Sequence, residues 1–88
     1  MKTMHKVTGY TLSYCPWCKK AKQFFAERNI PIDCVDYDLA DKPEQARILR
    51  EIKAFSGGDV TFPYVVIDDT PVMGLHTDRY IALLGLDE

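Results

Sequence analysis

The sequence contains no apolar stretch approaching the roughly 20 residues that a membrane-spanning helix needs, so we expect no association with a membrane. Residues 1–10 include basic side chains, but no apolar run follows them, which argues against a signal peptide. With 11 lysines and arginines against 13 acidic residues, the formal net charge is −2, without the basic patch or stripe of a nucleic-acid binder. These absences predict a cytoplasmic protein that binds neither membranes nor nucleic acids.

Cysteine is also scarce. The three cysteines are Cys15, Cys18 and Cys34, an odd number that argues against a disulfide framework. In a reducing cytoplasm, a close pair such as Cys15 and Cys18 is expected to be catalytic or to bind a metal. The 88 residues, 47% of them hydrophobic, suit a single domain spanning residues 1–88, which we expect to be a monomer.

The predicted order of elements is β-α-β-α-β-β-α. Apolar or alternating stretches indicate strands at residues 5–13, 31–39, 64–68 and 71–73. A first helix begins at the cysteine pair, with Pro16 in its first position and a stop signal at Asn29. A second helix follows the capping pair Asp41 and Glu44, and a last short helix ends before Gly85. A βαβ unit followed by a hairpin predicts an α/β fold with a mixed four-stranded sheet and three flanking helices.

The Cys-Pro-Trp-Cys segment stands where the first strand passes into the first helix. Free N–H groups and the positive end of the helix dipole stabilise an anion there, which lowers the pKa of a thiol. Cys15 is therefore the expected nucleophile, and Cys18, one turn further in, the expected resolving thiol of two-step thiol–disulfide exchange. We expect Pro16 to hold the turn, Trp17 to be partly exposed beside the disulfide, and Lys19 to tune the thiol pKa.

Metal binding is the alternative use of such a pair. A structural zinc site takes four ligands, often from two Cys-x-x-Cys pairs, but this chain has one pair. The other candidate ligands, His5, Cys34 and His76, are scattered singly, so we expect no metal site. Cys34 is expected to be a buried strand residue, with a regulatory second disulfide as the alternative. His5 and His76 are expected to be exposed.

Together with Thr61-Phe62-Pro63, the Cys-Pro-Trp-Cys segment resembles the glutaredoxin family. Dithiol members carry Cys-Pro-Tyr-Cys after the first strand and Thr-Val-Pro before the third, and the resemblance extends over nearly the whole chain. It implies a thioredoxin fold, thiol–disulfide oxidoreductase activity, no bound cofactor and a redox-active disulfide between Cys15 and Cys18. It also implies that the Phe62–Pro63 bond is cis and that Thr61, Phe62 and Pro63 position an extended thiol substrate.

The chain departs at two places from the glutaredoxins that use glutathione. Those members usually carry a lysine three residues before the first cysteine, where this chain has Leu12. They also carry Gly-Gly-x-Asp after the hairpin, where this chain has Met-Gly-Leu-His-Thr-Asp. With Gly74 and Leu75 expected near the disulfide, this second segment is more similar to the glutaredoxin-like electron donors of ribonucleotide reductase. Those proteins are commonly reduced by a thioredoxin-type reductase.

The predicted function is therefore a dithiol oxidoreductase that reduces protein disulfides and serves electron transport and redox homeostasis. Its electron donor is expected to be a thioredoxin-type reductase or glutathione. The alternative is an iron–sulfur cluster-binding glutaredoxin. Such members typically carry Cys-Gly-Phe-Ser or a glycine after the first cysteine, and Pro16 argues against that interpretation.

Overall fold

The computed structural model describes residues 6–86 and contains the predicted elements in the predicted order. The strands are β1 (Val7–Thr11), β2 (Asp33–Asp36), β3 (Tyr64–Ile67) and β4 (Thr70–Met73), and the helices are α1 (Pro16–Glu27), α2 (Lys42–Ser56) and α3 (Thr77–Leu84). The strand predicted over residues 31–39 is wrong at both ends, because β2 is shorter and a 3-10 helix, η1 (Tyr37–Leu39), follows it. His5 lies outside the described residues.

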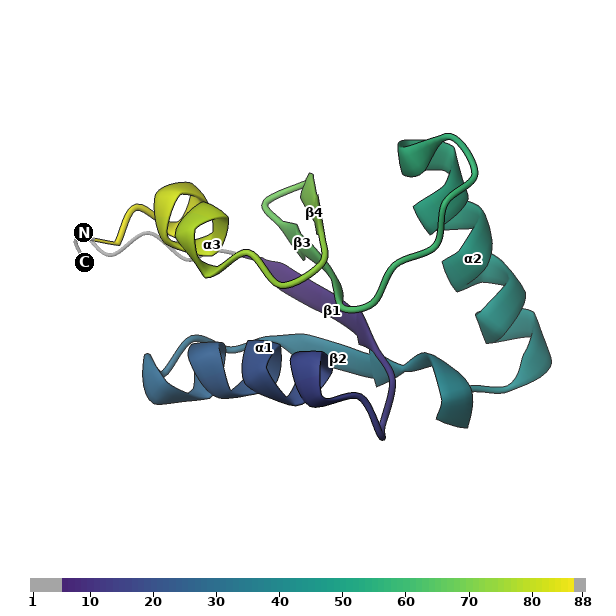
Figure 1. Cartoon of the computed structure of the whole chain (residues 1–88), viewed down its shortest axis with the longest axis horizontal. Helices are drawn as coiled ribbons and strands as arrows, with labels where there is room; N and C mark the ends of the chain where they lie inside the picture. Colours follow the sequence, from purple (N-terminus) through teal and green to yellow (C-terminus); the bar gives the residue numbers. More distant parts are fainter. Residues whose placement is uncertain (1–5, 87–88) are drawn as a thin grey trace.

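The sheet has the order β2-β1-β3-β4, which confirms the predicted mixed, four-stranded arrangement. Strands β1 and β2 are parallel, with Gly9 opposite Cys34, whereas β3 runs antiparallel to both β1 and β4. Figure 1 shows α1 and α3 on one side of the sheet and α2 on the other. The sheet is therefore covered on both faces, and β2 and β4 are its edges.

Apolar side chains fill the space on each face of the sheet. The cluster between the sheet and helices α1 and α3 contains Val7, Phe24, Phe25, Val65, Ile67, Val72, Tyr80 and Leu84. The cluster between the sheet and α2 contains Tyr10, Ile48, Ile52 and Tyr64. Because successive side chains of a strand point to opposite faces, β1 and β3 contribute to both clusters. The first cluster fixes α1 against the sheet and so fixes the position of its first turn.

The ends of α2 are set by local signals in the sequence. The Asp41 carboxylate accepts a hydrogen bond from the Glu44 N–H at 3.0 Å, as the capping pair predicts. At the other end Gly57 has φ of +83°, a conformation that glycine adopts without strain. Phe55, which the spacing of apolar residues places on the same face as Ile48 and Ile52, is 53% exposed, with its ring centroid 6.2 Å from that of Tyr64.

The start of α3 differs from the sequence prediction of a side-chain cap at Thr77 or Asp78. His76 is the N-cap, and its side chain makes no capping hydrogen bond within residues 6–86. The His76 carbonyl accepts the Tyr80 N–H at 3.1 Å. Burial of Tyr80 and Leu84 against the sheet, rather than a cap, holds this helix in place.

Candidate active site

Cys15 is the N-cap residue of α1, directly before Pro16 in the first helical position. Its carbonyl accepts the Lys19 N–H at 3.1 Å, and its own N–H donates to the Leu12 carbonyl at 3.2 Å. These bonds hold the loop from β1 in a tight turn that leads into the helix. The Cys15 thiol is partly exposed, so another molecule can approach it.

Cys18 lies one turn further along α1 and has an exposed fraction of 0%. Its Sγ accepts a hydrogen bond from the Leu12 N–H at 3.3 Å, so the end of β1 contacts the second thiol directly. The pair thus consists of an accessible sulfur and an enclosed sulfur. This confirms the predicted placement of Cys15 outward and Cys18 inward.

The pKa values of the two thiols move in opposite directions. Burial by itself would raise the pKa of Cys15, but hydrogen bonds from the Cys18 N–H, the Cys18 thiol and the Trp17 N–H outweigh it and lower that pKa. Burial raises the pKa of Cys18 to about 11, against the lowering effect of the Leu12 N–H and the Lys22 charge. Cys15 is therefore the thiol that ionises first, as a nucleophile must.

The loop before β3 is tied to the loop after β4. The Phe62–Pro63 peptide bond is cis, as the family resemblance implies, and Pro63 is buried. The Pro63 carbonyl accepts the Gly74 N–H at 2.8 Å, and the Tyr80 hydroxyl donates to the Gly74 carbonyl at 2.9 Å. Gly74 has φ of +88°, and a Cβ there would lie 3.9 Å from Thr61 Cγ2. The structure thus brings Thr61, Pro63 and Gly74 together.

Exposed aromatic side chains flank the cysteine pair. Trp17 is 56% exposed, with the Lys20 Nζ 5.1 Å from the centroid of its ring, and Tyr14 is 70% exposed. Phe62 is half-buried, and its ring centroid is 5.4 Å from that of Tyr37. The predicted partial exposure of Trp17 is confirmed, and the residue lies in the first turn of α1.

Leu75 and His76 follow Gly74 in the chain. Leu75, expected beside the disulfide, is half-buried and packs against the cluster under α1 and α3. His76 is exposed, as expected, and its Nε2 would lie 3.3 Å from a Cβ placed on Gly74.

The prediction for Cys34 is wrong. Cys34 is exposed rather than buried, because it lies on the edge strand β2, opposite Gly9, which has no side chain to cover it. The expected effect of Lys19 on the thiol pKa stays a prediction. Among the residues that the structure describes, the cation whose charge acts on Cys18 is Lys22 on α1.

Three polar features of the site were missed from the sequence. Tyr80 belongs to the last helix, and nothing in the local sequence predicts the hydrogen bond from its hydroxyl to the Gly74 carbonyl. The Ser13 N–H donates to Asp38 at 2.9 Å, and its hydroxyl donates to the same carboxylate, which ties the loop before Cys15 to η1. Lys22 did carry a signal, because it follows Cys18 by four residues and so lies on the same face of α1.

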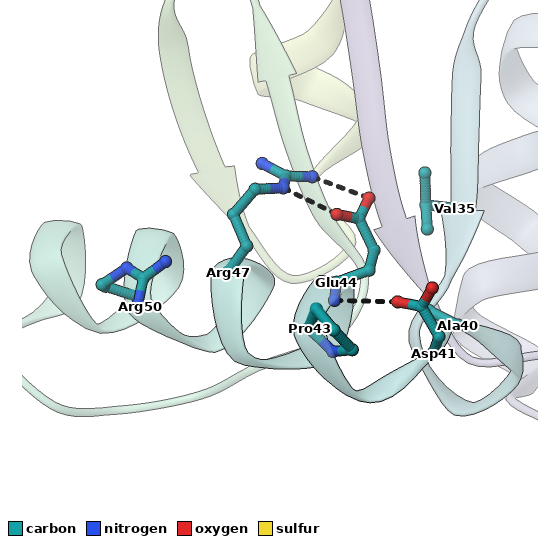
Figure 2. Close-up of a pocket in the computed structure, with 7 residues that line it drawn as sticks. All are labelled: Val35, Ala40, Asp41, Pro43, Glu44, Arg47 and Arg50. Carbon is teal, nitrogen blue, oxygen red and sulfur yellow. Dashed lines mark hydrogen bonds and ion pairs between the residues drawn. The ribbon is translucent and has the colours of Figure 1, made fainter.

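A cavity of about 660 Å³ lies beside the start of α2. Figure 2 shows that its polar groups are largely paired with one another. Arg47 donates to both oxygens of Glu44, at 2.8 and 2.9 Å, and Asp41 caps the helix. None of the predicted site residues lines this cavity, so it is not part of the dithiol site.

Within residues 6–86, no group of three or more His, Cys, Asp or Glu side chains is arranged to hold a metal ion. In the same residues, no helix is both long and apolar enough to cross a membrane.

A partly exposed cysteine at the start of the first helix, an enclosed partner one turn later and a cis proline before β3 are the features of a thioredoxin-fold dithiol protein. Comparison with known proteins gives the family. Residues 7–72 match the family model described as glutaredoxin. The chain therefore belongs to the glutaredoxin family, whose members are thiol–disulfide oxidoreductases.

Relatives of known sequence agree. Glutaredoxin 1 of Rickettsia conorii is 31% identical over 71 residues, which are 81% of this chain and 66% of that protein. The chain thus spans just under two thirds of the length of that relative. A glutaredoxin-like protein in the rubredoxin operon of Clostridium pasteurianum is 33% identical over 67 residues, 76% of this chain and 81% of that protein.

Solved structures confirm the fold. The glutaredoxin from Methanosarcina mazei Go1 is 30% identical with a TM-score of 0.83, and the match covers 92% of this chain and 79% of that chain. Methanoredoxin from Methanosarcina acetivorans is 27% identical with a TM-score of 0.83, covering 92% of this chain and 85% of that chain. The predicted thioredoxin fold is therefore confirmed.

Proposed function

We propose that this protein is a cytoplasmic, monomeric oxidoreductase that reduces disulfides in other proteins through Cys15 and Cys18. The observation that carries the proposal is the contrast between the two thiols. Cys15 is accessible and has a lowered pKa, whereas Cys18 is enclosed and has a pKa raised to about 11. One thiol is thus suited to attack an incoming disulfide, and the other is protected until that attack has occurred.

The reaction then proceeds by two exchanges. The Cys15 thiolate attacks one sulfur of the target disulfide, and the other target sulfur leaves as a thiolate. Cys18 loses its proton and attacks Cys15 Sγ, which releases the second target sulfur and forms the Cys15–Cys18 disulfide. Pro63 has no N–H and so presents no backbone donor, and the family resemblance implies that the Phe62 backbone pairs with an extended target segment.

A protein target fits the surface around the pair. Tyr14 and Trp17, close to Cys15 in the chain, supply exposed aromatic area, and Leu39 on η1 is 72% exposed. The Ser13–Asp38 bonds hold η1 beside the loop that carries Tyr14. Aromatic side chains of this kind often dominate protein interfaces.

The same surface favours a reductase over glutathione as the electron donor. Glutathione carries two carboxylates and an amine, and it loses affinity where these groups are desolvated without partners. Leu12, half-buried and tied by its backbone to both cysteines, offers no charge. The similarity to a protein in a rubredoxin operon also supports a protein electron donor.

Two cysteine variants test the mechanism. Cys15→Ser should abolish reduction of a protein disulfide, whereas Cys18→Ser should accumulate a mixed disulfide with the target, seen by mass spectrometry. Trapping by Cys15→Ser instead would reverse the assigned roles. A brown, iron-containing protein after oxygen-free purification would favour the cluster-binding alternative.

A side-by-side assay tests the donor. The oxidised protein is mixed with glutathione at millimolar concentration or with a thioredoxin-type reductase and its reductant. We expect faster reduction by the reductase, and a raised glutathione rate in Leu12→Lys, which keeps the backbone bonds of residue 12. Efficient turnover of the unmodified protein with glutathione would contradict this part of the proposal.

A further inference from the structure

A polar cluster lies where β1 and β2 end, under the first turn of α1. The side chain of Thr11 is 1% exposed, and its hydroxyl donates to the Asp36 carboxylate. The Lys22 Nζ, on α1, donates to the same Asp36 oxygen at 2.9 Å. The hydrogen bond from Thr11, followed by that from Lys22, lowers the pKa of Asp36, and the bond to Asp36 raises the pKa of Lys22. The lysine therefore stays charged.

This cluster adjoins the resolving thiol. Lys22 follows Cys18 by four residues, so the two side chains leave α1 on the same face, one turn apart. Leu12, the residue after Thr11, donates its N–H to Cys18 Sγ at 3.3 Å. Thr11, the last residue of β1, thus contacts Asp36, which holds Lys22, and the next residue, Leu12, contacts the Cys18 thiol.

Several other titratable groups act on this part of the molecule. Cys15, the N-cap residue of α1, raises the pKa of Cys18. Tyr80 lies on α3, and the charge of Cys18 contributes to its raised pKa. Asp36 and Cys34, both on β2, raise the pKa of Lys22. Asp38, on η1, has a raising effect on the pKa of Asp36. Within residues 6–86, the cation whose charge acts on Cys18 is Lys22, and the hydrogen bond and charge of Cys15 oppose its effect on the Cys18 pKa.

We propose that Lys22, anchored by Asp36 and Thr11, is a positioning residue that favours the thiolate of Cys18 during the resolving step. The inference rests on the proposed dithiol mechanism and names a further residue for it. The proton of Cys18 passes to solvent, the Cys18 thiolate attacks Cys15 Sγ, the Cys15–target bond breaks, and the released target thiolate takes up a proton. Lys22 keeps its protons throughout and acts through its charge.

The test separates the two exchanges in time. In a Cys34→Ser background, the reduced protein is mixed with one equivalent of an aromatic disulfide that releases a coloured thiolate. The first release reports attack by Cys15, and the second, which does not depend on protein concentration, reports attack by Cys18. Both rates are followed by stopped-flow absorbance between pH 6 and pH 9.

Lys22→Gln removes the charge and retains an amide that can bond to Asp36. We expect the second phase to slow about threefold across this pH range, because a thiol pKa raised by about one unit leaves about tenfold less thiolate but makes that thiolate more nucleophilic. The first phase should stay within about twofold, since Cys15 draws its stabilisation from N–H donors of α1. Lys22→Arg should restore the second phase, and Lys53→Met, on α2, should leave both phases unchanged. Lys22→Met serves as a second uncharged variant if the glutamine variant does not fold.

An unchanged second phase in a folded Lys22→Gln or Lys22→Met protein would overturn the proposal. An equal slowing of both phases would also overturn it, because that pattern indicates general damage to the site. Absence of a second release in the Cys34→Ser protein with Lys22 intact would instead refute the dithiol mechanism itself, and this inference with it.

Discussion

At the scale of single residues, the two thiols of the site differ because of their surroundings. Cys15 sits before the first turn of α1, where N–H groups point at its sulfur, whereas Cys18 is enclosed by α1, the end of β1 and α3. Hydrogen bonds to an ionised group lower its pKa, and burial raises the pKa of a thiol. The order in which the thiols react therefore follows from position along one helical turn.

Alkylation tests this difference. In the reduced protein treated with iodoacetamide between pH 5 and pH 10, Cys15 should react at pH values below the ordinary thiol pKa of about 8.5, because its lowered pKa supplies thiolate there. Cys18 should resist modification until far higher pH. Peptide mass spectrometry assigns the sites. Modification of Cys18 before Cys15 would contradict the assignment.

The exposure of Cys34 leads to a second prediction. Because Cys34 is on an open edge strand, Cys34→Ala should change the free energy of unfolding by less than about 0.5 kcal/mol and leave turnover intact. Urea denaturation and a disulfide reductase assay measure the two quantities. Cys18→Ala, at an enclosed position, is the contrast and should cost more stability. Loss of most activity in folded Cys34→Ala would indicate a redox role for this thiol.

At the scale of elements, helices are fixed in two different ways. The long helix α2 starts at a side-chain cap and ends at a glycine with positive φ, so its limits are set by its own sequence. In contrast, α3 is short, and the burial of Tyr80 and Leu84 holds it against the sheet. Its position therefore depends on the rest of the fold.

The cap of α2 can be removed without touching the dithiol. Asp41→Ala should cost about 1 kcal/mol of unfolding free energy, because the Glu44 N–H loses its acceptor. Asp41→Asn, which keeps an acceptor oxygen, should retain most of the stability. Urea denaturation measures both, and disulfide reduction by the folded variants should stay at the original rate. Equal stability of the alanine and original proteins would show that the cap contributes nothing.

The bond from α3 to the loop after β4 can be removed in the same way. Tyr80→Phe leaves the ring in the core but deprives the Gly74 carbonyl of its donor, which should cost about 1 kcal/mol. Tyr14→Phe, at a side chain that is 70% exposed, is the matched control and should cost less than about 0.5 kcal/mol. Equal urea midpoints for the two variants would argue against a contribution from this bond.

At the scale of the whole molecule, the redox site occupies one end of the sheet. Exposed aromatic residues gather around the cysteine pair, while the cavity beside α2 lies elsewhere and has paired polar groups. A partner that docks on the site therefore meets an apolar surface with lysines beside it. Under the proposed function, this is the surface that a target protein contacts.

Trp17 is the test of that surface. Trp17→Ala should raise the KM for a protein disulfide about tenfold, equivalent to about 1.4 kcal/mol, and leave the reduction of a small organic disulfide nearly unchanged. Phe55→Ala, an exposed aromatic on α2 at the other face of the sheet, is the control and should change neither KM. Equal losses with both substrates would indicate an effect on the dithiol itself.

The sequence by itself determined the order of the elements, the start of α1 at the cysteine pair and the limits of α2. Those features depend on groups within a few residues of one another, such as Pro16 after Cys15 or Asp41 before Glu44. The cis bond at Pro63 was anticipated from the family resemblance rather than from local physics, since most such bonds are trans.

Only the tertiary structure decided which side chains are covered and which distant groups meet. Cys34 is exposed because β2 is an edge, and the sequence of β2 does not state its neighbours in the sheet. The pairing of Lys22 with Asp36 joins a helix to a strand, since α1 is packed across that strand. Local signals fix elements because their energies act within one turn, whereas burial and pairing arise where elements from separate parts of the chain pack together.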